Sequence, residues 1–356
     1  MPLEDIKEKF AELTRALKKI KRVYLLCHDN PDPDSLASMM ALRYLLSRHF
    51  KIRSSLLYGG EIGRAENRAM VRLLKIPIRN LESVRLRKNA KFALVDTQPE
   101  ARNHSLPEDA KVVMVFDHHP SKKPMRSSFH HVCEDLGATS TLMFDYLQEA
   151  GIEIDRRLAT ALAYALITET QDLGREACRD DIRVYQKLIP KVKLRLLSDI
   201  RYSVLPQDYF QTLGKALNNT YYYKNIVVTR LGLVNSTDMI HQLADLFLRF
   251  ERRSWSLCIG WSSDYILLSL RSSNMQARCG KMIAKLVKGK GSAGGHDMVA
   301  GGRINCNGMP EKEKIKTEEL VISRFLRALG HGSSLEILSP VIDHNQNQSD
   351  SLENLP

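Results

Sequence analysis

The first half of the chain alternates between short apolar runs of strand length and longer stretches with helical periodicity. Strands are predicted by the apolar runs at residues 22–27, 51–58, 91–95 and 111–116. Helices are predicted where apolar residues recur every three or four positions, at residues 36–46, 64–75, 139–150 and 155–170. The last two apolar runs hardly alternate with polar residues, which is typical of strands buried on both faces. This order predicts an α/β fold with a parallel sheet covered on both sides.

The second half of the chain has its own pattern and predicts a smaller α/β domain. An apolar strand at residues 226–234 is followed by a helix, two strands around residues 255–270, another helix and a glycine-rich turn. The predicted boundaries are a first domain over residues 1–200, a connector over 201–225, a second domain over 226–335 and a polar tail over 336–356. Because the end of the tail lacks any hydrophobic period, we expect it to be disordered.

Composition places the chain among ordinary globular proteins. Of its 356 residues, 43% are hydrophobic and 26% are charged, and no apolar run approaches the ~20 residues that span a bilayer. The six cysteines are scattered without a C-x-x-C pair, which argues against a zinc site and against disulfides. The N-terminal segment alternates charged and apolar positions at helical spacing, unlike a signal peptide. We therefore expect a cytoplasmic protein with no membrane partner.

The formal net charge of +12 is unevenly distributed along the chain. Residues 36–95 hold thirteen Lys and Arg against three Glu and no Asp, and residues 271–290 hold six basic residues and no acidic ones. Either stretch alone could be a solvated helix face. Two such stretches beside the acidic motifs described next favour a polyanionic ligand. Aromatic residues that could stack on bases are few and follow no pattern, so charge alone does not establish nucleic-acid binding.

Acidic and imidazole side chains directly follow three of the predicted strands. The first strand is followed by residues 28–35, H-D-N-P-D-P-D-S, the third by Asp96, and the fourth by Asp117, His118 and His119. Ligands of open parallel sheets bind at this carboxyl edge. One Asp alone could be a helix N-cap or a turn residue, and one His pair alone could be a surface turn. Several carboxylates at one edge repel each other unless a cation neutralises them, and carboxylates mixed with imidazoles suit Mn²⁺ or Mg²⁺.

These motifs resemble those of a known family. The segments H-D-N-P-D-P-D-S, V-D-T, D-H-H-P and I-T-E-T resemble, in this order, four motifs of the DHH phosphoesterases. In the second half, Arg271-Ser272 and residues 294–302, G-G-H-D-M-V-A-G-G, resemble the domain that follows the catalytic one in RecJ-like exonucleases and nano-RNases. The resemblance covers residues 21–304, and the set of motifs is specific, whereas the D-H-H triplet alone would be weak.

The resemblance implies a site for two Mn²⁺ ions, with Mg²⁺ as the alternative. His28 and Asp32 would bind one ion, Asp34 and His118 would bind the other, and Asp96 would bridge the two. Two ions held in this way can share one hydroxide and also contact phosphate oxygens. The first domain would therefore be the catalytic one.

The resemblance also implies roles for residues around the ions. Asp117 would orient an imidazole, and His119 would face the scissile phosphate. Where the family has Asp in the fourth motif, this chain has Glu169, whose extra methylene moves the carboxylate by about a bond length. Asp172, one helical turn later, is the alternative ligand. Pro33 stands where the family commonly has Gly, and it stiffens the loop.

For the second domain, the resemblance implies that it grips the substrate. Glycines let backbone N–H groups approach an anion closely, and an Arg and a His add charged contacts to a terminal phosphate. A flexible turn without a ligand is the alternative interpretation of the glycines. The active site would lie in a cleft between the two domains. The substrate-binding residues implied by the resemblance are Arg271, Ser272, Gly294, Gly295 and His296.

The predicted function is Mn²⁺-dependent hydrolysis of short oligoribonucleotides, linear dinucleotides or 3′-phosphoadenosine 5′-phosphate. The compact two-domain chain favours short substrates. One alternative is a RecJ-like exonuclease of single-stranded DNA, and another is a nucleotide-binding protein whose catalysis is impaired by Glu169. Pyrophosphatase activity ranks lower, because relatives with that activity have a different second domain. A homodimer would be in keeping with the family, although the sequence leaves the oligomeric state open.

Overall fold

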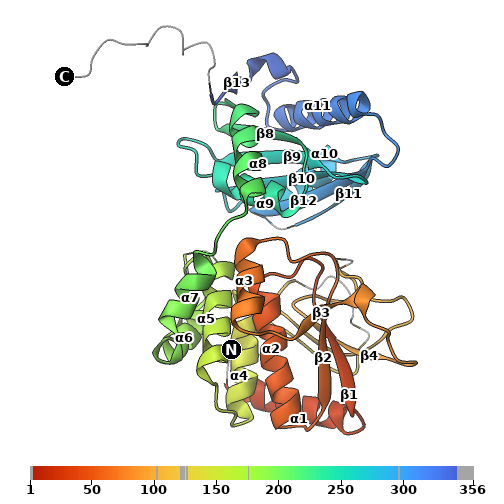
Figure 1. Cartoon of the computed structure of the whole chain (residues 1–356), viewed down its shortest axis with the longest axis vertical. Coiled ribbons are helices and arrows are strands. Elements are labelled where there is room, and N and C mark those ends of the chain that lie inside the picture. Colours follow the sequence, from red (N-terminus) through yellow and green to blue (C-terminus); the bar gives the residue numbers. More distant parts are fainter. Residues whose placement is uncertain are drawn as a thin grey trace, which may run out of the picture. The chain divides into compact units, whose positions relative to one another are not determined.

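The computed structural model describes residues 3–101, 103–120, 125, 127–174, 176–295 and 297–342. The chain divides into two units, Met1–Val204 and Leu205–Pro356, which are called unit 1 and unit 2 below (Figure 1). The part of the predicted disordered tail at residues 343–356 lies outside the described residues.

Unit 1 contains the predicted parallel sheet, and the predicted fold class is confirmed. All neighbouring strands run parallel in the order β3-β2-β1-β4-β5-β6. The central strands β1 and β4 bury nearly every residue, in agreement with their continuous apolar runs. The strands are β1 (Arg22–Leu26), β2 (Arg53–Tyr58), β3 (Ile78–Asn80), β4 (Lys91–Val95), β5 (Lys111–Asp117) and β6 (His130–Val132).

The two faces of this sheet are covered differently. The seven helices in the described part of unit 1 all contribute to the larger core on one face. The opposite face buries a smaller cluster that packs under loop residues such as Leu86 and Leu106. The sheet is therefore covered on both sides, by helices on one face and by loops on the other. The helical elements are α1 (Leu3–Leu17), α2 (Pro33–Arg48), α3 (Ala65–Leu73), α4 (Thr139–Glu149), α5 (Arg156–Glu169), α6 (Arg179–Leu188) and α7 (Leu194–Arg201), with 3₁₀ turns η1 (Leu81–Ser83) and η2 (Ile189–Lys191).

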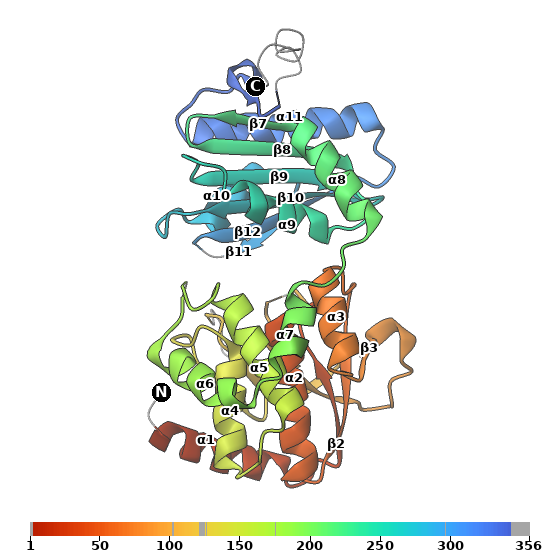
Figure 2. The same cartoon turned by 60° about the vertical axis from the view of Figure 1, so that its left-hand side comes forward.

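Unit 2 is a mixed sheet with helices on both faces (Figure 2). Its strand order is β11-β12-β10-β9-β8-β7-β13, with β8 and β9 parallel and the other pairs antiparallel. Helices α10 and α11 pack on one core, and α8 and α9 pack on the other. The elements are α8 (Gln207–Asn218), β7 (Thr220–Tyr223), β8 (Ile226–Leu233), α9 (Asp238–Phe247), β9 (Trp255–Trp261), β10 (Tyr265–Ser272), α10 (Cys279–Leu286), β11 (Gly291–Gly295), β12 (Val299–Asn305), α11 (Glu311–Ala328), η3 (Leu335–Ile337) and β13 (Ser339–Pro340).

The structure differs from the prediction at the glycine-rich segment. Instead of a turn, most of residues 291–305 form the antiparallel pair β11–β12. The prediction was wrong because glycines were taken as signs of a turn, although they also occur in strands where two backbones approach closely. A Cβ at Gly295, for example, would lie 2.4 Å from the Cα of Ala300.

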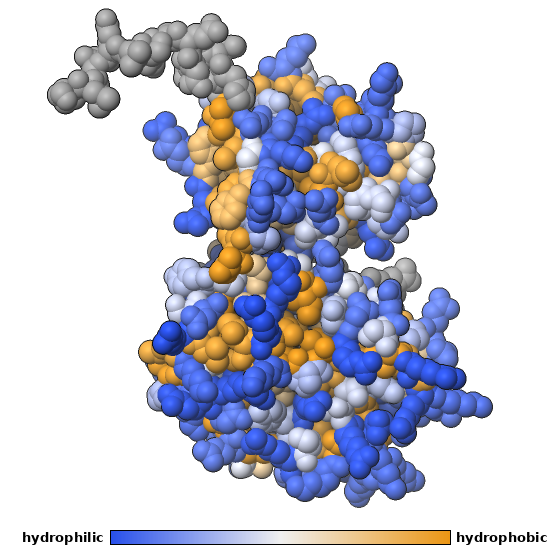
Figure 3. Space-filling model, viewed as in Figure 1, coloured by the Kyte–Doolittle hydropathy of each residue, from blue (hydrophilic) through white to orange (hydrophobic). Residues whose placement is uncertain are grey.

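Regular structure extends into both segments outside the two predicted domains. The expected connector contains α8 and β7, and the first residues of the expected tail contain the end of η3 and β13. Among the described residues, no helix is both long and apolar enough to cross a membrane. On the face seen in Figure 3, hydrophilic residues surround smaller apolar patches in both units.

Candidate metal centre

The carboxyl ends of three neighbouring strands bring the predicted metal ligands of unit 1 together. Strands β1, β4 and β5 are adjacent and parallel, so the residues that follow them share one edge of the sheet. His28 lies just beyond β1, Asp96 directly follows β4, and His118 directly follows β5. Asp96 is anchored there because its backbone N–H donates to the carbonyl of Phe116 on β5 (2.8 Å).

Asp96 is the centre of the cluster. Its side chain is 2% exposed, and its backbone adopts the left-handed conformation (φ 60°), which Asp tolerates better than most residues. Its Oδ2 lies 3.6 Å from Nε2 of His28, and its Oδ1 lies 3.7 Å from Nε2 of His118. The two oxygens of one buried carboxylate therefore face two different imidazoles, as the predicted bridging position requires.

Among the residues that the structure describes, potential donor atoms form two groups that share Asp96. One group consists of His28, Asp32 and Asp96, and the other of Asp96, His118 and His119. Within each group the donor atoms lie within 4.8 Å of one another. Mixed carboxylate and imidazole donors suit Mn²⁺ and related divalent ions, so the residues fit two ions that share one carboxylate.

Backbone contacts orient two of the imidazoles toward this centre. Nδ1 of His28 donates to the carbonyl of Asp29 (2.9 Å), and Nδ1 of His118 donates to the carbonyl of Leu136 (3.0 Å). Because a carbonyl can only accept, Nδ1 carries the proton in both rings. Nε2 is then the nitrogen that faces Asp96, and second contacts of this kind are usual for metal-binding His.

Asp32 combines two roles that the sequence left as alternatives. Its Oδ1 accepts from the backbone N–H of Ser35 (2.9 Å) and so caps α2, while Pro33 occupies a favourable first helical position. Its Oδ2 lies 3.5 Å from Nε2 of His28. The N-cap thus places a carboxylate in the first donor group.

Asp34 lies beside the donor groups and is held by the start of α4. Its oxygens accept from the backbone N–H groups of Thr139 (2.7 Å) and Ser140 (2.9 Å), where the helix dipole favours negative charge. The hydroxyl of Thr139 also donates to Oδ1 of Asp96 (2.8 Å). One helix terminus therefore fixes two of the predicted ligands.

The charges in this cluster strongly influence one another. Complete burial raises the pKa of Asp34 well above its ordinary value, and the charges of Asp96 and Glu169 add to this effect. Burial also acts to raise the pKa of Asp96, but the hydrogen bond with His28 and the charges of His119 and His118 outweigh it, so its pKa is lowered. The carboxylates thus require positive charge nearby, which a bound cation would also supply.

Asp117 orients His119 rather than joining either donor group. Its Oδ1 accepts from Nδ1 of His119 (2.8 Å) and from the backbone N–H of His118 (2.9 Å). Burial acts to lower the pKa of His119, but the hydrogen bond to Asp117 and the charge of Asp96 raise it to about 10. His119 was predicted to face the phosphate without binding metal. In the structure, a ring nitrogen of His119 also lies within 4.8 Å of potential metal-binding atoms of Asp96 and His118.

Glu169 ends α5 and is half-buried. Its charge contributes to raising the pKa of both Asp34 and His119, so its carboxylate lies near the cluster. Asp172 instead forms an ion pair with Arg201 (2.8 Å), and its side chain is 60% exposed. Glu169 therefore acts electrostatically on the cluster, whereas Asp172 is engaged in a surface ion pair.

Sequence reasoning missed the residues that support this centre. Besides Thr139 and Ser140, these include Gln98, which donates to the carbonyl of His119 (2.7 Å), and Leu136, whose carbonyl orients His118. The small and hydroxyl-bearing run of residues 137–141, G-A-T-S-T, directly before and within the first turn of a helix was the available signal, because such a terminus binds anions.

Two of the predicted substrate-binding residues of unit 2, Arg271 and Ser272, are engaged within that unit. Arg271 is buried and donates through Nε to Oδ1 of Asp245 (2.5 Å). Ser272 donates to the carbonyl of Ser254 (2.9 Å). Gly294 and Gly295 lie in β11, an edge strand whose residues are all exposed. His296 lies outside the described residues.

Comparisons with known proteins agree with the family resemblance found in the sequence. Residues 22–166 match the DHH family, N-terminal domain. An uncharacterised protein of Methanocaldococcus jannaschii is 30% identical over 313 residues, which are 86% of this chain and 64% of that protein. A probable manganese-dependent inorganic pyrophosphatase of Lactobacillus helveticus is 26% identical over 182 residues, which are 49% of this chain and 55% of that protein. The chain spans less than two thirds of the length of either relative.

A solved structure shares the fold. An exopolyphosphatase-related protein from Bacteroides fragilis superposes with a TM-score of 0.73 at 15% sequence identity. The match covers 91% of this chain and 98% of that protein. At this level of identity the likeness concerns the fold alone.

Proposed function

Residues 22–166 belong to the DHH family, N-terminal domain, and from this premise we propose that the chain is a metal-dependent hydrolase of phosphate esters that acts on short oligonucleotides or dinucleotides. The arrangement around Asp96 is the observation that carries this proposal. One buried carboxylate faces His28 on one side and His118 on the other, at 3.6 and 3.7 Å. Manganese as the metal is supported by the name of the Lactobacillus helveticus relative.

The donors divide naturally between two ions. His28 and Asp32 would hold one, His118 the other, and Asp96 both, with Asp34 and Glu169 close by. Bound there, divalent ions would neutralise phosphate charge and supply hydroxide at neutral pH. Asp117 holds the ring of His119 through Nδ1, and we assign His119 to contact the scissile phosphate or protonate the leaving oxygen.

A nucleotide-containing substrate is supported by charge and by unit 2. The net charge of +12 favours a polyanion. Strand β11 is an exposed edge strand, and such a strand presents N–H groups that no neighbouring strand satisfies. These groups would contact phosphate oxygens, while Arg271 and Ser272, which are engaged inside the unit, would shape this region rather than touch the substrate.

Inorganic pyrophosphate is the second candidate substrate. The relative that favours it is named a probable manganese-dependent inorganic pyrophosphatase, and its similarity covers 49% of this chain. The two candidates differ in whether a base and sugar are needed for fast turnover.

A substrate panel tests the proposal. Purified protein would be assayed with Mn²⁺ and with chelator on an RNA dinucleotide, a longer RNA, single-stranded DNA, 3′-phosphoadenosine 5′-phosphate and inorganic pyrophosphate. We expect Mn²⁺-dependent turnover that is fastest on the dinucleotide or the bisphosphate. Fastest turnover of pyrophosphate would favour the second candidate, and fastest turnover of DNA would favour an exonuclease.

Substitution of Glu169 distinguishes an active enzyme from a protein with impaired catalysis. If its longer side chain limits catalysis, Glu169→Asp should raise turnover on the best substrate. If the site is adapted to Glu, the same change should lower turnover, while Asp172→Asn, which alters a surface ion pair, should leave it unchanged. Absence of turnover in both the parent and Glu169→Asp, with nucleotide binding retained, would contradict the proposed hydrolase activity.

A further inference from the structure

Unit 1 has a concentration of basic residues at the opposite end of its sheet from the metal centre. A pocket of about 580 Å³ there is lined by four basic residues, three serines and one apolar residue, and by no acidic residue. Arg22 begins β1 and His28 follows the other end of that strand, so the length of β1, roughly 16 Å, separates the two sites. The lining residues are Arg22, Arg43, Ser47, Lys51, Ile52, Arg53, Ser54 and Ser55.

Two of the arginines are direct neighbours in the sheet. Arg22 on β1 pairs with Arg53 on β2 in parallel register, and neighbouring strands lie only about 4.8 Å apart. Among the described residues, neither arginine has a carboxylate partner. Like charges side by side are unfavourable unless an anion lies between or beside them, so this pairing has an electrostatic cost that an anion would remove.

The rest of the pocket supplies hydrogen-bond donors. Arg43 on α2 donates through Nη1 to the carbonyl of Ser54 (3.2 Å), which fixes its guanidinium beside the start of β2. The hydroxyl of Ser54 has no partner among the described residues. Guanidinium groups and hydroxyls together are well suited to the oxygens of a phosphate group.

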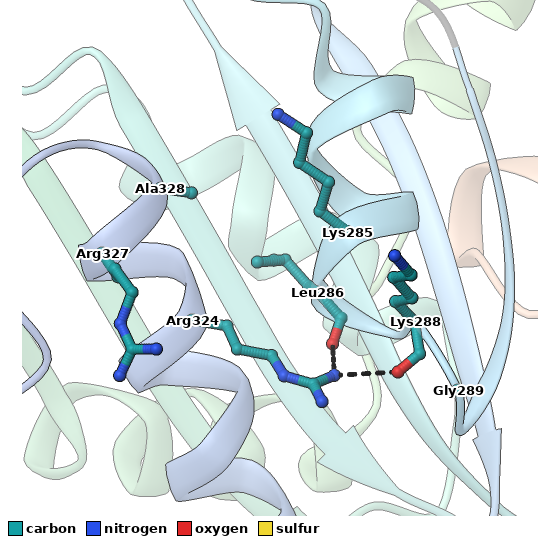
Figure 4. Close-up of a pocket in the computed structure, with 7 residues that line it drawn as sticks. All are labelled: Lys285, Leu286, Lys288, Gly289, Arg324, Arg327 and Ala328. Atoms are coloured by element: carbon teal, nitrogen blue, oxygen red, sulfur yellow. Dashed lines mark hydrogen bonds between the residues drawn. The ribbon is translucent and has the colours of Figure 1, made fainter.

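A basic pocket of similar size in unit 2 shows why basic lining residues alone do not indicate an anion site. It is lined by Lys285, Lys288, Arg324 and Arg327 with three uncharged residues (Figure 4). Arg324 donates to the carbonyls of Leu286 (2.7 Å) and Lys288 (3.1 Å) at the end of α10. Cations at helix C-termini commonly stabilise those carbonyls and the helix dipole, so this pocket has a sufficient structural explanation.

The same explanation covers only part of the unit 1 pocket. Lys51 donates to the carbonyl of Arg48, the last residue of α2 (2.7 Å), as a helix cap would. Arg22 and Arg53 lie at the starts of strands, where no helix terminus needs them. Basic residues can also protect a sheet edge from pairing with other chains, since β3 pairs only with Leu56–Tyr58 and leaves the start of β2 open. Edge protection alone predicts no anion binding.

We propose that the pocket lined by Arg22, Arg43, Arg53 and Ser54 is a second anion site, which binds a phosphate monoester distinct from the substrate in the metal centre. Two sources share this chemistry: a free mononucleotide, and the terminal phosphate of an oligonucleotide. The site does not depend on the proposed reaction, because its occupancy can be measured without turnover. It gives unit 1 a means of sensing a product or holding the end of a longer strand.

Calorimetric binding to the full chain in the presence of chelator tests the site. The probes are inorganic phosphate, adenosine monophosphate, and a dinucleotide with and without a 5′-phosphate. We expect Arg22→Gln/Arg53→Gln to weaken binding of phosphate monoesters by roughly tenfold or more. The control Arg85→Gln/Arg87→Gln removes the same charge at exposed positions outside the pocket and should bind like the parent.

The probes also distinguish the sources of the phosphate. Tighter binding of the 5′-phosphorylated dinucleotide than of adenosine monophosphate, lost in the pocket variant, identifies an oligonucleotide end. Equal or tighter binding of the mononucleotide, also lost in that variant, identifies the free nucleotide. Equal binding by parent and pocket variant, or no binding by the parent, would overturn the proposal and leave edge protection as the role of the arginines.

Thermal unfolding separates a binding role from a structural one. In phosphate-free buffer, Arg22→Gln/Arg53→Gln should have an equal or higher Tm than the parent, because it removes a repulsion. Added phosphate should raise the Tm of the parent and of the Arg85→Gln/Arg87→Gln control, since a ligand that binds only the folded state stabilises it. An equal rise in the pocket variant, or a large loss of its Tm without phosphate, would contradict the anion site.

Discussion

The residues predicted for the site in unit 1 and those predicted in unit 2 occupy different kinds of position. In unit 1, His28, Asp96 and His118 lie just beyond the ends of parallel strands, where their side chains converge. In unit 2, Arg271 lies inside an antiparallel ladder, opposite Ser256 and Val299, and its guanidinium is paired with Asp245. A side chain just beyond a strand end can face a ligand, whereas a side chain within a strand ladder interacts with residues of neighbouring elements. The position of a motif residue in the sheet therefore affects whether its side chain is available to bind a ligand.

The largest effect is expected at the shared carboxylate of unit 1. Asp96→Asn keeps the side-chain shape and tolerates the left-handed backbone, but it removes the charge that faces both His28 and His118. We expect turnover with Mn²⁺ to fall by more than about 100-fold, beyond the usual effect of changing an outer partner of a metal ligand. Circular dichroism would establish that the variant is folded. Retained turnover in a folded Asp96→Asn protein would remove the basis for a shared ligand.

A smaller loss is expected from a residue that only supports the centre. Thr139→Val preserves the buried volume but removes the hydroxyl that donates to Asp96, so we expect Mn²⁺ affinity or turnover to fall about 10- to 100-fold. The matched control is Thr141→Val on the same helix, which removes a buried hydrogen bond to Asp181. It should lower stability without changing Mn²⁺ affinity. Equal losses of Mn²⁺ affinity in both variants would mean that the effect is general to α4.

Arg271 provides the corresponding test in unit 2. If its role is structural, Arg271→Met should lower the free energy of unfolding by about 2 kcal/mol, the scale of a hydrogen bond to a charged group, and leave KM for a small phosphodiester unchanged. Denaturant titration and steady-state kinetics would measure the two quantities. A raised KM with unchanged stability would instead place Arg271 on the substrate and weaken the contrast between the two units.

The smallest expected effect is a pH dependence of the stability of unit 2. Burial raises the pKa of Glu318 to about 7, despite the opposing charge of Arg230. The folded state therefore keeps this proton while the unfolded chain loses it near 4.5. The resulting stability is present below pH 4.5 and is lost as pH rises to about 7. Glu318→Gln should flatten this part of the stability curve, whereas Glu319→Gln, at a more exposed neighbour, should not. If the stability of Glu318→Gln changed with pH as steeply as that of the parent, the raised pKa of Glu318 would be contradicted.

Much of the fold was predictable because periodicity is a local property of long elements. Continuous apolar runs predicted β1, β4 and β5, and steps of three and four predicted α2 to α5 of unit 1. Strands β3 and β6 have three residues each, which is too short for a period to be recognised. The β11–β12 hairpin was missed because its glycines carry no side-chain pattern, and only the neighbouring strand explains them.

The site was predictable for the residues that follow strands and less so for those that support them. Contacts from Asp34 to Thr139 and Ser140 join residues more than a hundred positions apart, and no local pattern carries that information. The burial of Arg271 likewise depends on Asp245, which lies on a different element. Motifs therefore predicted which types of chemical group are present, whereas tertiary packing determined which of those side chains lie in the site.

The first turn of α4 has a consequence for how the protein acquires its metal. Because the backbone of this turn holds Asp34 and its Thr139 hydroxyl holds Asp96, the carboxylates are set in place by the polypeptide itself. Loading an ion then requires expulsion of protons and water rather than refolding of loops. Metal uptake should consequently be rapid, reversible and steeply dependent on acidity. Under the proposed function, the availability of manganese would set the fraction of active molecules without changing how many are folded.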